Sequence, residues 1–405
     1  MANHQPAILF NATTQPTMLT LIVLASISAI AMNMFLPSLP SMAQHYGTSA
    51  AIMGLAVGTY LGASAVIQII AGPMADLYGR RPVILWSLTI FTAASFGIIF
   101  TTTLTSFFVL RAVQAIAASA MILSRAIVRD TTDAATAGSK IAYVTMGMSV
   151  APMLTPALGG YIDMFFGWQG NFWALGLIGI GVWLMAYSDQ GETAAKSHQN
   201  VWGQFRQYPI LLKSRRFWGY CLASAFGSGA FFAYLGGAPF VGGVIYGLQP
   251  DALGIYFGAP ALGYFLGNFL SGRYSIRIGS DTMVVVGLII TLLGLITSIV
   301  VDALHLDSAA TFFGFMTFVG LGNGMTIPNA TAGMLSVRPD LAGTASGLGS
   351  SVMIGGGAGL SALAGIMLHP ENGALVLNAI MATSVAIGLL CILYVMHRNR
   401  NLNTL

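Results

Sequence analysis

Charged residues are scarce in this sequence. Of its 405 residues only 7% are charged, whereas 56% are hydrophobic. A soluble domain typically carries about 25% charged residues. The 16 basic and 12 acidic side chains are too few to cover a soluble protein of this length. This shortage excludes a soluble enzyme, a disordered chain and a coiled coil, and it indicates a protein that crosses a membrane many times.

Cysteine and histidine are also rare, with two and six residues. Cys221 and Cys391 both lie inside apolar stretches, so we expect neither a disulfide framework nor a thiolate metal site. No histidine and no acidic residue lies in the interior of such a stretch. An enzyme that acts within the membrane would need these side chains in a cluster. We therefore expect no enzyme activity, no cofactor and no metal.

Continuous apolar runs take up most of the chain. A membrane helix needs roughly 20 predominantly apolar residues, and the runs do not alternate as barrel strands would. The pattern predicts an all-α membrane protein with twelve spans, at residues 18–37, 51–71, 83–102, 106–126, 141–162, 170–188, 217–239, 252–272, 282–301, 309–330, 343–367 and 374–396. The polar segment 189–216, whose end is amphipathic, would separate two six-helix bundles, 1–188 and 217–405.

Lysine and arginine fall on one side of the predicted membrane. Fifteen of the 16 lie around the loops after the even-numbered helices or in the C-terminal tail. Because cytoplasmic loops are enriched in these residues, we predict that both termini are cytoplasmic. The first apolar run has no basic segment before it and no cleavage site after it, so we expect it to be retained. The basic loops suit anionic lipid, not nucleic acid.

The turn after the second predicted helix carries a motif, Gly72-Pro-Met-Ala-Asp76-Leu-Tyr-Gly79-Arg80-Arg81. It resembles the signature loop of the major facilitator superfamily, G-x-x-x-D-R-x-G-R-R/K, although Leu77 replaces the usual arginine. The glycines permit a tight turn. The arginines would pair with Asp130 or Asp133 as a latch that opens in another conformation. A plain, positively charged turn is the alternative.

This turn has a counterpart in the second half. Gln68, Gly72 and Gly79 correspond to Asn268, Gly272 and Gly279, 200 residues further on. The match indicates an internal duplication. Two related six-helix halves with a site between them are typical of transporters.

Arg111 is the one basic residue outside the cytoplasmic positions. It lies inside the fourth predicted helix, where a charge costs about 2.5–3.5 kcal/mol on insertion scales. Such a residue marks a functional site that faces the bundle interior, unless it reaches back to the outer interface. Gln114 lies one turn on, on the same face. The pair resembles the superfamily pattern R-x-x-Q-G, with Ala115 in place of glycine.

The fifth predicted helix contains four residues that kink a helix or let it pack closely. They resemble the antiporter motif G-P-x-x-G-G of drug-efflux members, although Ala151 precedes the first proline and the spacing is longer. Such a helix can bend and can pack closely enough against its neighbours to seal the transport pathway. An ordinary kinked packing helix is the alternative. The four residues are Pro152, Pro156, Gly159 and Gly160.

The end of the first helix is the most diagnostic stretch, Met32-Asn33-Met34-Phe35-Leu36-Pro37-Ser38-Leu39-Pro40. With the Gln68–Pro73, Arg125–Asp130, Ala151–Pro156 and Ala342–Ser346 segments, it resembles the bicyclomycin-resistance (Bcr/CflA) branch of multidrug efflux transporters, over essentially the whole chain. The resemblance implies the twelve-helix fold of the superfamily and drug:proton antiport across the bacterial inner membrane. We expect the protein to act as a monomer.

One position departs from this branch. Its first-helix motif is usually D-M-Y-L-P, with the acid as the supposed proton carrier beside the arginine of the fourth helix. Here the position is Asn33, which does not titrate but can accept a hydrogen bond from Arg111. The cavity would then be electropositive and suited to an anionic substrate. Alternatively, Asp163, near the outer end of the fifth helix, could reach Arg111 and carry the proton.

We therefore expect an exporter of amphipathic, drug-like molecules that works by alternating access and proton-linked antiport. The alternative is an exporter of one anionic metabolite, uncoupled or differently coupled because of Asn33. Aromatic and amide side chains would complete the cavity. On family position and residue type, these are Tyr60, Tyr234 and Asn323, with Phe231, Phe232, Asn268 and Asn329 as further candidates.

Overall fold

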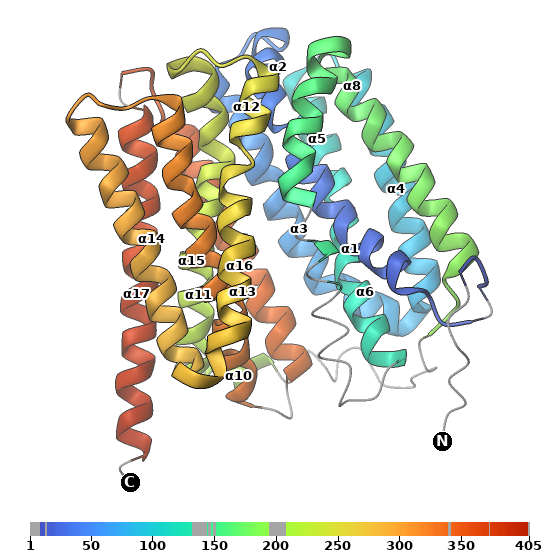
Figure 1. The fold of residues 1–405 in the computed structure, drawn as a ribbon. Helices are drawn as coiled ribbons and strands as arrows, with labels where there is room; N and C mark the ends of the chain where they lie inside the picture. Colours follow the sequence, from blue (N-terminus) through green and yellow to red (C-terminus); the bar gives the residue numbers. More distant parts are fainter. Residues whose placement is uncertain are drawn as a thin grey trace.

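A computed structural model describes residues 9–12, 14–131, 144, 147–148, 151–193, 208–338, 342–371 and 373–403. Apart from turns and short connections, these residues form helices, and no strand occurs among them. Figure 1 shows two groups of helices side by side, an N-terminal group coloured blue to green and a C-terminal group coloured yellow to red.

Short breaks divide several of the predicted spans into two helices. The N-terminal group contains α1 (Met18–Asn33), η1 (Leu36–Ser38), α2 (Leu39–His45), α3 (Ala50–Tyr78), α4 (Arg80–Ile99), α5 (Leu104–Gln114), η2 (Ala115–Ala117), α6 (Ala118–Thr131) and α8 (Ala151–Asp189). The C-terminal group contains α11 (Arg215–Phe240), the π-helical η3 (Val241–Ile245), α12 (Pro250–Tyr256), α13 (Ala259–Ile278), α14 (Ser280–Ala303), α15 (Ala309–Ser336), α16 (Ala342–Met367) and α17 (Gly373–Asn403). Of the predicted amphipathic segment, the short α10 (Tyr208–Leu212) is described, whereas 201–207 lie outside the described residues.

Eleven helices among the described residues are long and apolar enough to cross a membrane. One of them, α8, contains the second half of the predicted span 141–162 and the whole of the predicted span 170–188, and it breaks at Gly167, where φ is 68°. Figure 1 shows its two limbs meeting at the top of the view. Large apolar side chains such as Trp86, Leu177 and Leu390 are more than 60% exposed, as expected for a surface that faces lipid.

Two matching glycine turns reflect the predicted duplication. Gly79 joins α3 to α4 with a φ of 98°, and Gly279 joins α13 to α14 with a φ of 84°. Glycine adopts such angles at no steric cost. The same turn thus recurs at the offset of 200 residues that the sequence predicts.

The two groups touch along α3 and α16 and, at one end, through α8 and α12. This end also carries α2, and we call it the α2/α12 end (top of Figure 1). The charge pattern of the loops predicts that it faces outward. The opposite end, where α10 lies, carries the start of α4 and the end of α17.

Candidate functional site

Arg111 is fully buried on α5. Its guanidinium lies over the rings of Phe35 and Tyr60, 4.1 Å and 4.3 Å from their centroids. It donates hydrogen bonds to the carbonyl oxygen of Ala31 at 3.0 Å and to Oε1 of Gln114. Within the described part of the chain it forms no ion pair. Two aromatic faces and two neutral acceptors therefore hold the cation in place of a carboxylate.

A second layer of hydrogen bonds fixes this cluster. Gln114 donates from Nε2 to Oγ of Ser95 at 2.8 Å, and the hydroxyls of Tyr60 and Ser28 lie 3.0 Å apart. These bonds connect α5 with α4, and α3 with α1. Because the partners of Arg111 all lie inside the bundle, the guanidinium does not extend to the outer interface.

Asn33 makes a different contact from the one expected. It is 1% exposed, and its Nδ2 donates to the carbonyl oxygen of Ala29 at 2.7 Å, one turn back on α1. Arg111 instead uses the backbone of Ala31. The expected hydrogen bond between Asn33 and Arg111 is not formed, because the carboxamide turns toward its own helix.

Asp163 lies apart from Arg111 and forms no ion pair with it. The residue is 8% exposed, and the Ser41 hydroxyl lies 3.5 Å from Oδ2. It sits four residues before the break at Gly167, whereas Arg111 lies roughly 10 Å inside α5. The expected contact is therefore absent, and Asp163 is a buried acid near the α2/α12 end.

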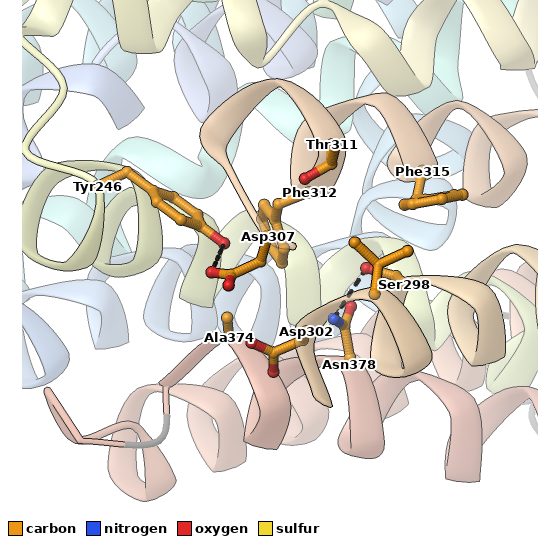
Figure 2. A pocket seen from close by; sticks show the side chains of 10 residues that line it. Tyr246, Ser298, Asp302, Asp307, Thr311, Phe312, Phe315, Ala374 and Asn378 are labelled. Carbon is orange, nitrogen blue, oxygen red and sulfur yellow. Dashed lines mark hydrogen bonds between the residues drawn. The ribbon is translucent and has the colours of Figure 1, made fainter. Parts of the chain in front are cut away.

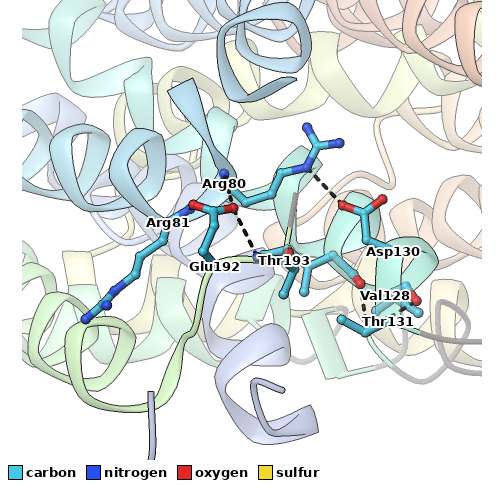
Figure 3. Close-up of polar contacts among 8 residues, drawn as sticks. Arg80, Arg81, Val128, Asp130, Thr131, Glu192 and Thr193 are labelled. Carbon is cyan, nitrogen blue, oxygen red and sulfur yellow. Dashed lines mark hydrogen bonds and ion pairs between the residues drawn. The ribbon is translucent and has the colours of Figure 1, made fainter. Parts of the chain in front are cut away.

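An ion pair forms at the other end, where a latch was predicted (Figure 3). Nε of Arg80, a residue only 6% exposed, lies 3.1 Å from Oδ2 of Asp130 on α6. The Glu192 carboxylate accepts the backbone N–H groups of Arg80 and Arg81 at 2.9 and 3.2 Å, which stabilises the start of α4. A β-carbon at Gly79 would overlap this carboxylate. The close approach therefore requires glycine.

The other motif residues differ in how they are held. Arg81 donates to the carbonyl oxygen of Tyr187 at 2.8 Å and lies 5.3 Å from the centroid of its ring. A β-carbon at Gly72 would meet nothing within 4 Å, so packing does not require glycine there in this conformation. The side chain of Asp76 and the whole of Asp133 lie outside the described residues.

The Arg80–Asp130 pair predicts a measurable coupling. Asp130→Asn keeps the shape and removes the charge, and we expect it and Arg80→Leu each to lower the midpoint of thermal unfolding. Because Asp130 is exposed, the ion pair should contribute about 0.2–1 kcal/mol, and the double variant should lose less than the sum of the single losses by that amount. Glu371→Gln, at an exposed position between α16 and α17, is the control. Strictly additive losses would show that the pair contributes nothing.

The predicted antiporter motif lies where helices cross. Gly159 packs against α1 within the N-terminal group, and a β-carbon there would overlap the carbonyl oxygen of Met34. Pro156 is buried inside α8. The side chain of Pro152 lies outside the described part.

The second glycine of this motif contacts the other group of helices. A β-carbon at Gly160 would overlap the carbonyl oxygen of Pro250 on α12, and one at Gly254 would overlap that of Pro156 on α8. Both contacts lie at the α2/α12 end. Backbone therefore meets backbone where the two groups close.

The candidates in the C-terminal group lie in a separate cluster. Tyr234 is fully buried, with the rings of Phe231, Phe257 and Phe313 at centroid distances of 5.3 to 6.3 Å. Its hydroxyl is buried without a hydrogen-bond partner. Asn323 is buried on α15. Neither residue contacts the Arg111 cluster among the described contacts.

Asp189 has a role that the sequence did not indicate. It is fully buried, and its carboxylate accepts bonds from the backbone of Phe10, the backbone and hydroxyl of Thr17, and the hydroxyl of Thr20, at 2.6 to 2.9 Å. The end of α8 thus holds the start of α1. The one sequence feature that could have indicated this role is the position of Asp189 directly after the apolar run 170–188. No group of three or more His, Cys, Asp or Glu that could hold a metal occurs among the described residues.

Two groups of membrane-length helices that meet at close crossings form a polytopic membrane protein, and its family consists of transporters, not enzymes. The chain belongs to the Major Facilitator Superfamily, whose family model matches residues 21–362 and 245–401.

Relatives of known name cover almost the whole chain. A bicyclomycin resistance protein homolog of Haemophilus influenzae is 27% identical over 387 residues, 94% of this chain and 96% of that protein. A chloramphenicol resistance protein of Pseudomonas aeruginosa is 29% identical over 374 residues, 90% of this chain and 88% of that protein. The crystal structure of a D-xylose–proton symporter shares the fold, with a TM-score of 0.78, 14% identity, and coverage of 93% of this chain and 96% of that chain.

Proposed function

We propose that the chain exports amphipathic, drug-like small molecules across the bacterial inner membrane by alternating access, with both termini in the cytoplasm. The observation that carries this proposal is the near full-length similarity to proteins named for bicyclomycin and chloramphenicol resistance. The concentration of basic residues on one side supports the orientation.

Export is coupled to protons, and Asp163 carries the proton. Asn33 cannot titrate, and Arg111 forms no ion pair within the described residues. Asp163 is a buried carboxyl near the α2/α12 end, with no ion-pair partner in the described part of the chain. Intramembrane acids mark proton routes in transporters. Coupling therefore occurs at α8, not at the end of α1.

The buried position of Arg111 argues against the second candidate, export of an anionic metabolite held by this residue. A substrate would have to displace the rings of Phe35 and Tyr60 and the bond to Ala31. The guanidinium thus acts as a connection between helices.

Asp163→Asn tests the coupling. Proteoliposomes with an internal pH dye and an imposed pH gradient should show drug-dependent proton movement with the wild type. With Asp163→Asn this signal should fall to that of protein-free liposomes, while drug binding persists. Glu371→Gln is the control, an exposed acid in the connection between α16 and α17.

Two outcomes would contradict this assignment. Full proton movement with Asp163→Asn would exclude Asp163 as the carrier. Drug flux without proton movement in the wild type would show uncoupled transport.

A further inference from the structure

The C-terminal group of helices is hollowed at both of its ends. At the α2/α12 end, Tyr246, Asp307 and Asn378 line a pocket of about 10 Å³ (Figure 2), which is room for one water molecule. Toward the opposite end, a groove of about 380 Å³ lies between α11 and α17. Ligand sites commonly have volumes of about 300–1,000 Å³, so of these two hollows only the groove has the size for an organic ligand.

The walls of this groove are apolar and face away from the protein. Leu222 on α11 and Ile387 and Leu390 on α17 line it, and the two side chains of α17 are exposed. Gly219 brings the two helices together, because a β-carbon there would overlap Cγ2 of Val395. Exposed apolar surface on a membrane helix meets lipid hydrocarbon, so these walls suit an acyl chain.

One end of the groove is positively charged. Arg215, at the start of α11, is exposed and is the one charged residue of the lining. The helix α17 finishes at the end of the molecule where α10 lies and α11 begins (Figure 1). Since Gly219 packs against Val395, Arg398, three residues later on α17, lies toward the same end as Arg215. Nε of Arg398 is buried without a hydrogen-bond partner, and neither arginine forms an ion pair within the described part of the chain. An anion would therefore be attracted to this end.

Trp218 lies beside this charged end. Its ring lines the groove, and its Nε1 donates to the carbonyl oxygen of Leu212, at the end of α10, at 2.8 Å. Tryptophan is enriched at the membrane–water interface. The carboxylate of Asp281 is held by neutral donors outside the groove lining, the hydroxyl of Tyr220 at 2.8 Å and Nδ2 of Asn399 at 3.2 Å. The groove thus runs from a cationic interface into the hydrocarbon.

We propose that this groove binds one anionic glycerophospholipid, with an acyl chain against Leu222 and Leu390 and the headgroup phosphate at Arg215 and Arg398. Basic pockets between membrane helices on the cytoplasmic side bind anionic headgroups, and arginine can hold a phosphate through two parallel hydrogen bonds. A zwitterionic headgroup would bring a further cation to both arginines. A second copy of the chain, oriented the same way in the membrane, would bring its own arginines to the same depth, and like charges repel.

Retention of lipid by the purified full-length protein tests this site. The protein, delipidated in a neutral detergent, is mixed with phosphatidylglycerol or with phosphatidylcholine of the same acyl chains, and the bound lipid is counted by native mass spectrometry. We expect one retained phosphatidylglycerol per chain and several-fold less phosphatidylcholine at equal concentration. The midpoint of thermal unfolding should rise saturably with phosphatidylglycerol. It should not rise with glycerol phosphate, which has the headgroup charge without the chains.

Variants show whether the groove and its arginine hold the lipid. Arg215→Ala should weaken retention of phosphatidylglycerol by about fivefold, which corresponds to the roughly 1 kcal/mol that a basic residue contributes near an anionic membrane surface. Leu222→Trp fills the groove and should reduce retention with both arginines kept. Ile387→Trp, at an exposed position, makes the same test if Leu222→Trp does not fold. Arg277→Ala, an exposed basic residue near the end of α13, is the matched control and should retain lipid as the wild type does.

Three results would overturn the proposal. The first is equal retention of the two phospholipids, which would mean that the groove holds bulk lipid without regard to charge. The second is equal retention by Arg215→Ala and Arg277→Ala. The third is a stable dimer that Leu222→Trp dissociates, because a second copy of the chain would then cover the groove.

Discussion

Arg111→Ala should abolish the drug resistance that the chain confers on a susceptible host and should lower the stability of the protein. The side chain is one of the largest that is fully buried, and truncation would leave a cavity between α5, α1 and α3. It would also remove two cation–π contacts, each worth about 2 kcal/mol when desolvated. We expect a loss of about 2–5 kcal/mol, the range of large-to-small core substitutions.

Arg111→Lys separates the charge of this residue from its shape. A lysine ammonium is a point charge that cannot stack on Phe35 and Tyr60 while also bonding the Ala31 carbonyl and Gln114. We therefore expect an intermediate thermal midpoint and intermediate resistance. Thermal unfolding of detergent-purified protein and the minimal inhibitory drug concentration are the two measurements. Arg277→Ala, at an exposed position near the end of α13, is the control. Wild-type values for Arg111→Ala would refute the structural role assigned here.

The fold follows from signals that act along the chain. Apolar runs of membrane length predict the spans, and the repeated glycine turns at Gly79 and Gly279 require only local conformation. Gln114 lies three residues after Arg111, so helical spacing alone predicts that they meet. The Arg80–Asp130 pair likewise follows from opposite charges predicted on one side of the membrane.

The contacts around Arg111 depend on how the helices pack against one another. The spacing of residues in the sequence does not define this packing. Phe35 and Tyr60 lie on different helices from Arg111, and their rings meet it only because α1 and α3 pack against α5. The sequence likewise could not show that Asn33 bonds to its own helix or that Asp163 lies too far from Arg111. For Asn33 the direction of the carboxamide decides the contact, and for Asp163 the different depth of the two residues along α8 and α5 decides it.

The contact that closes the α2/α12 end is made by backbone atoms. In α8 and in α12 a proline is followed four residues later by a glycine, Pro156 with Gly160 and Pro250 with Gly254. Each glycine faces the carbonyl oxygen of the other helix's proline. Small residues allow such close approach between membrane helices. A side chain at either glycine must push the two groups of helices apart.

Gly160→Ala should therefore reduce export strongly while leaving the protein folded. Overpacking costs about 1–3 kcal/mol, and here that cost falls on the closed α2/α12 end alone, which lowers its population by about 5–150-fold. Gly254→Ala should have the same effect, because it adds a methyl group to the other side of the same contact. Export from everted vesicles and the thermal midpoint are measured together.

Variants at two further glycines of α8 distinguish an effect on closure of the α2/α12 end from an effect on the stability of the fold. Gly159→Ala overlaps the Met34 carbonyl within one group, so it should lower the thermal midpoint more than Gly160→Ala does. A β-carbon at Gly181 would meet nothing within 4 Å, so Gly181→Ala should leave export unchanged. Because alanine favours a helix over glycine by about 0.8–1.0 kcal/mol, this variant should not lower the thermal midpoint. Wild-type export by Gly160→Ala would mean that the close approach of α8 and α12 is no step in transport. A selective loss of export at Gly160 and Gly254, with the thermal midpoint kept, would identify this crossing as the outer gate.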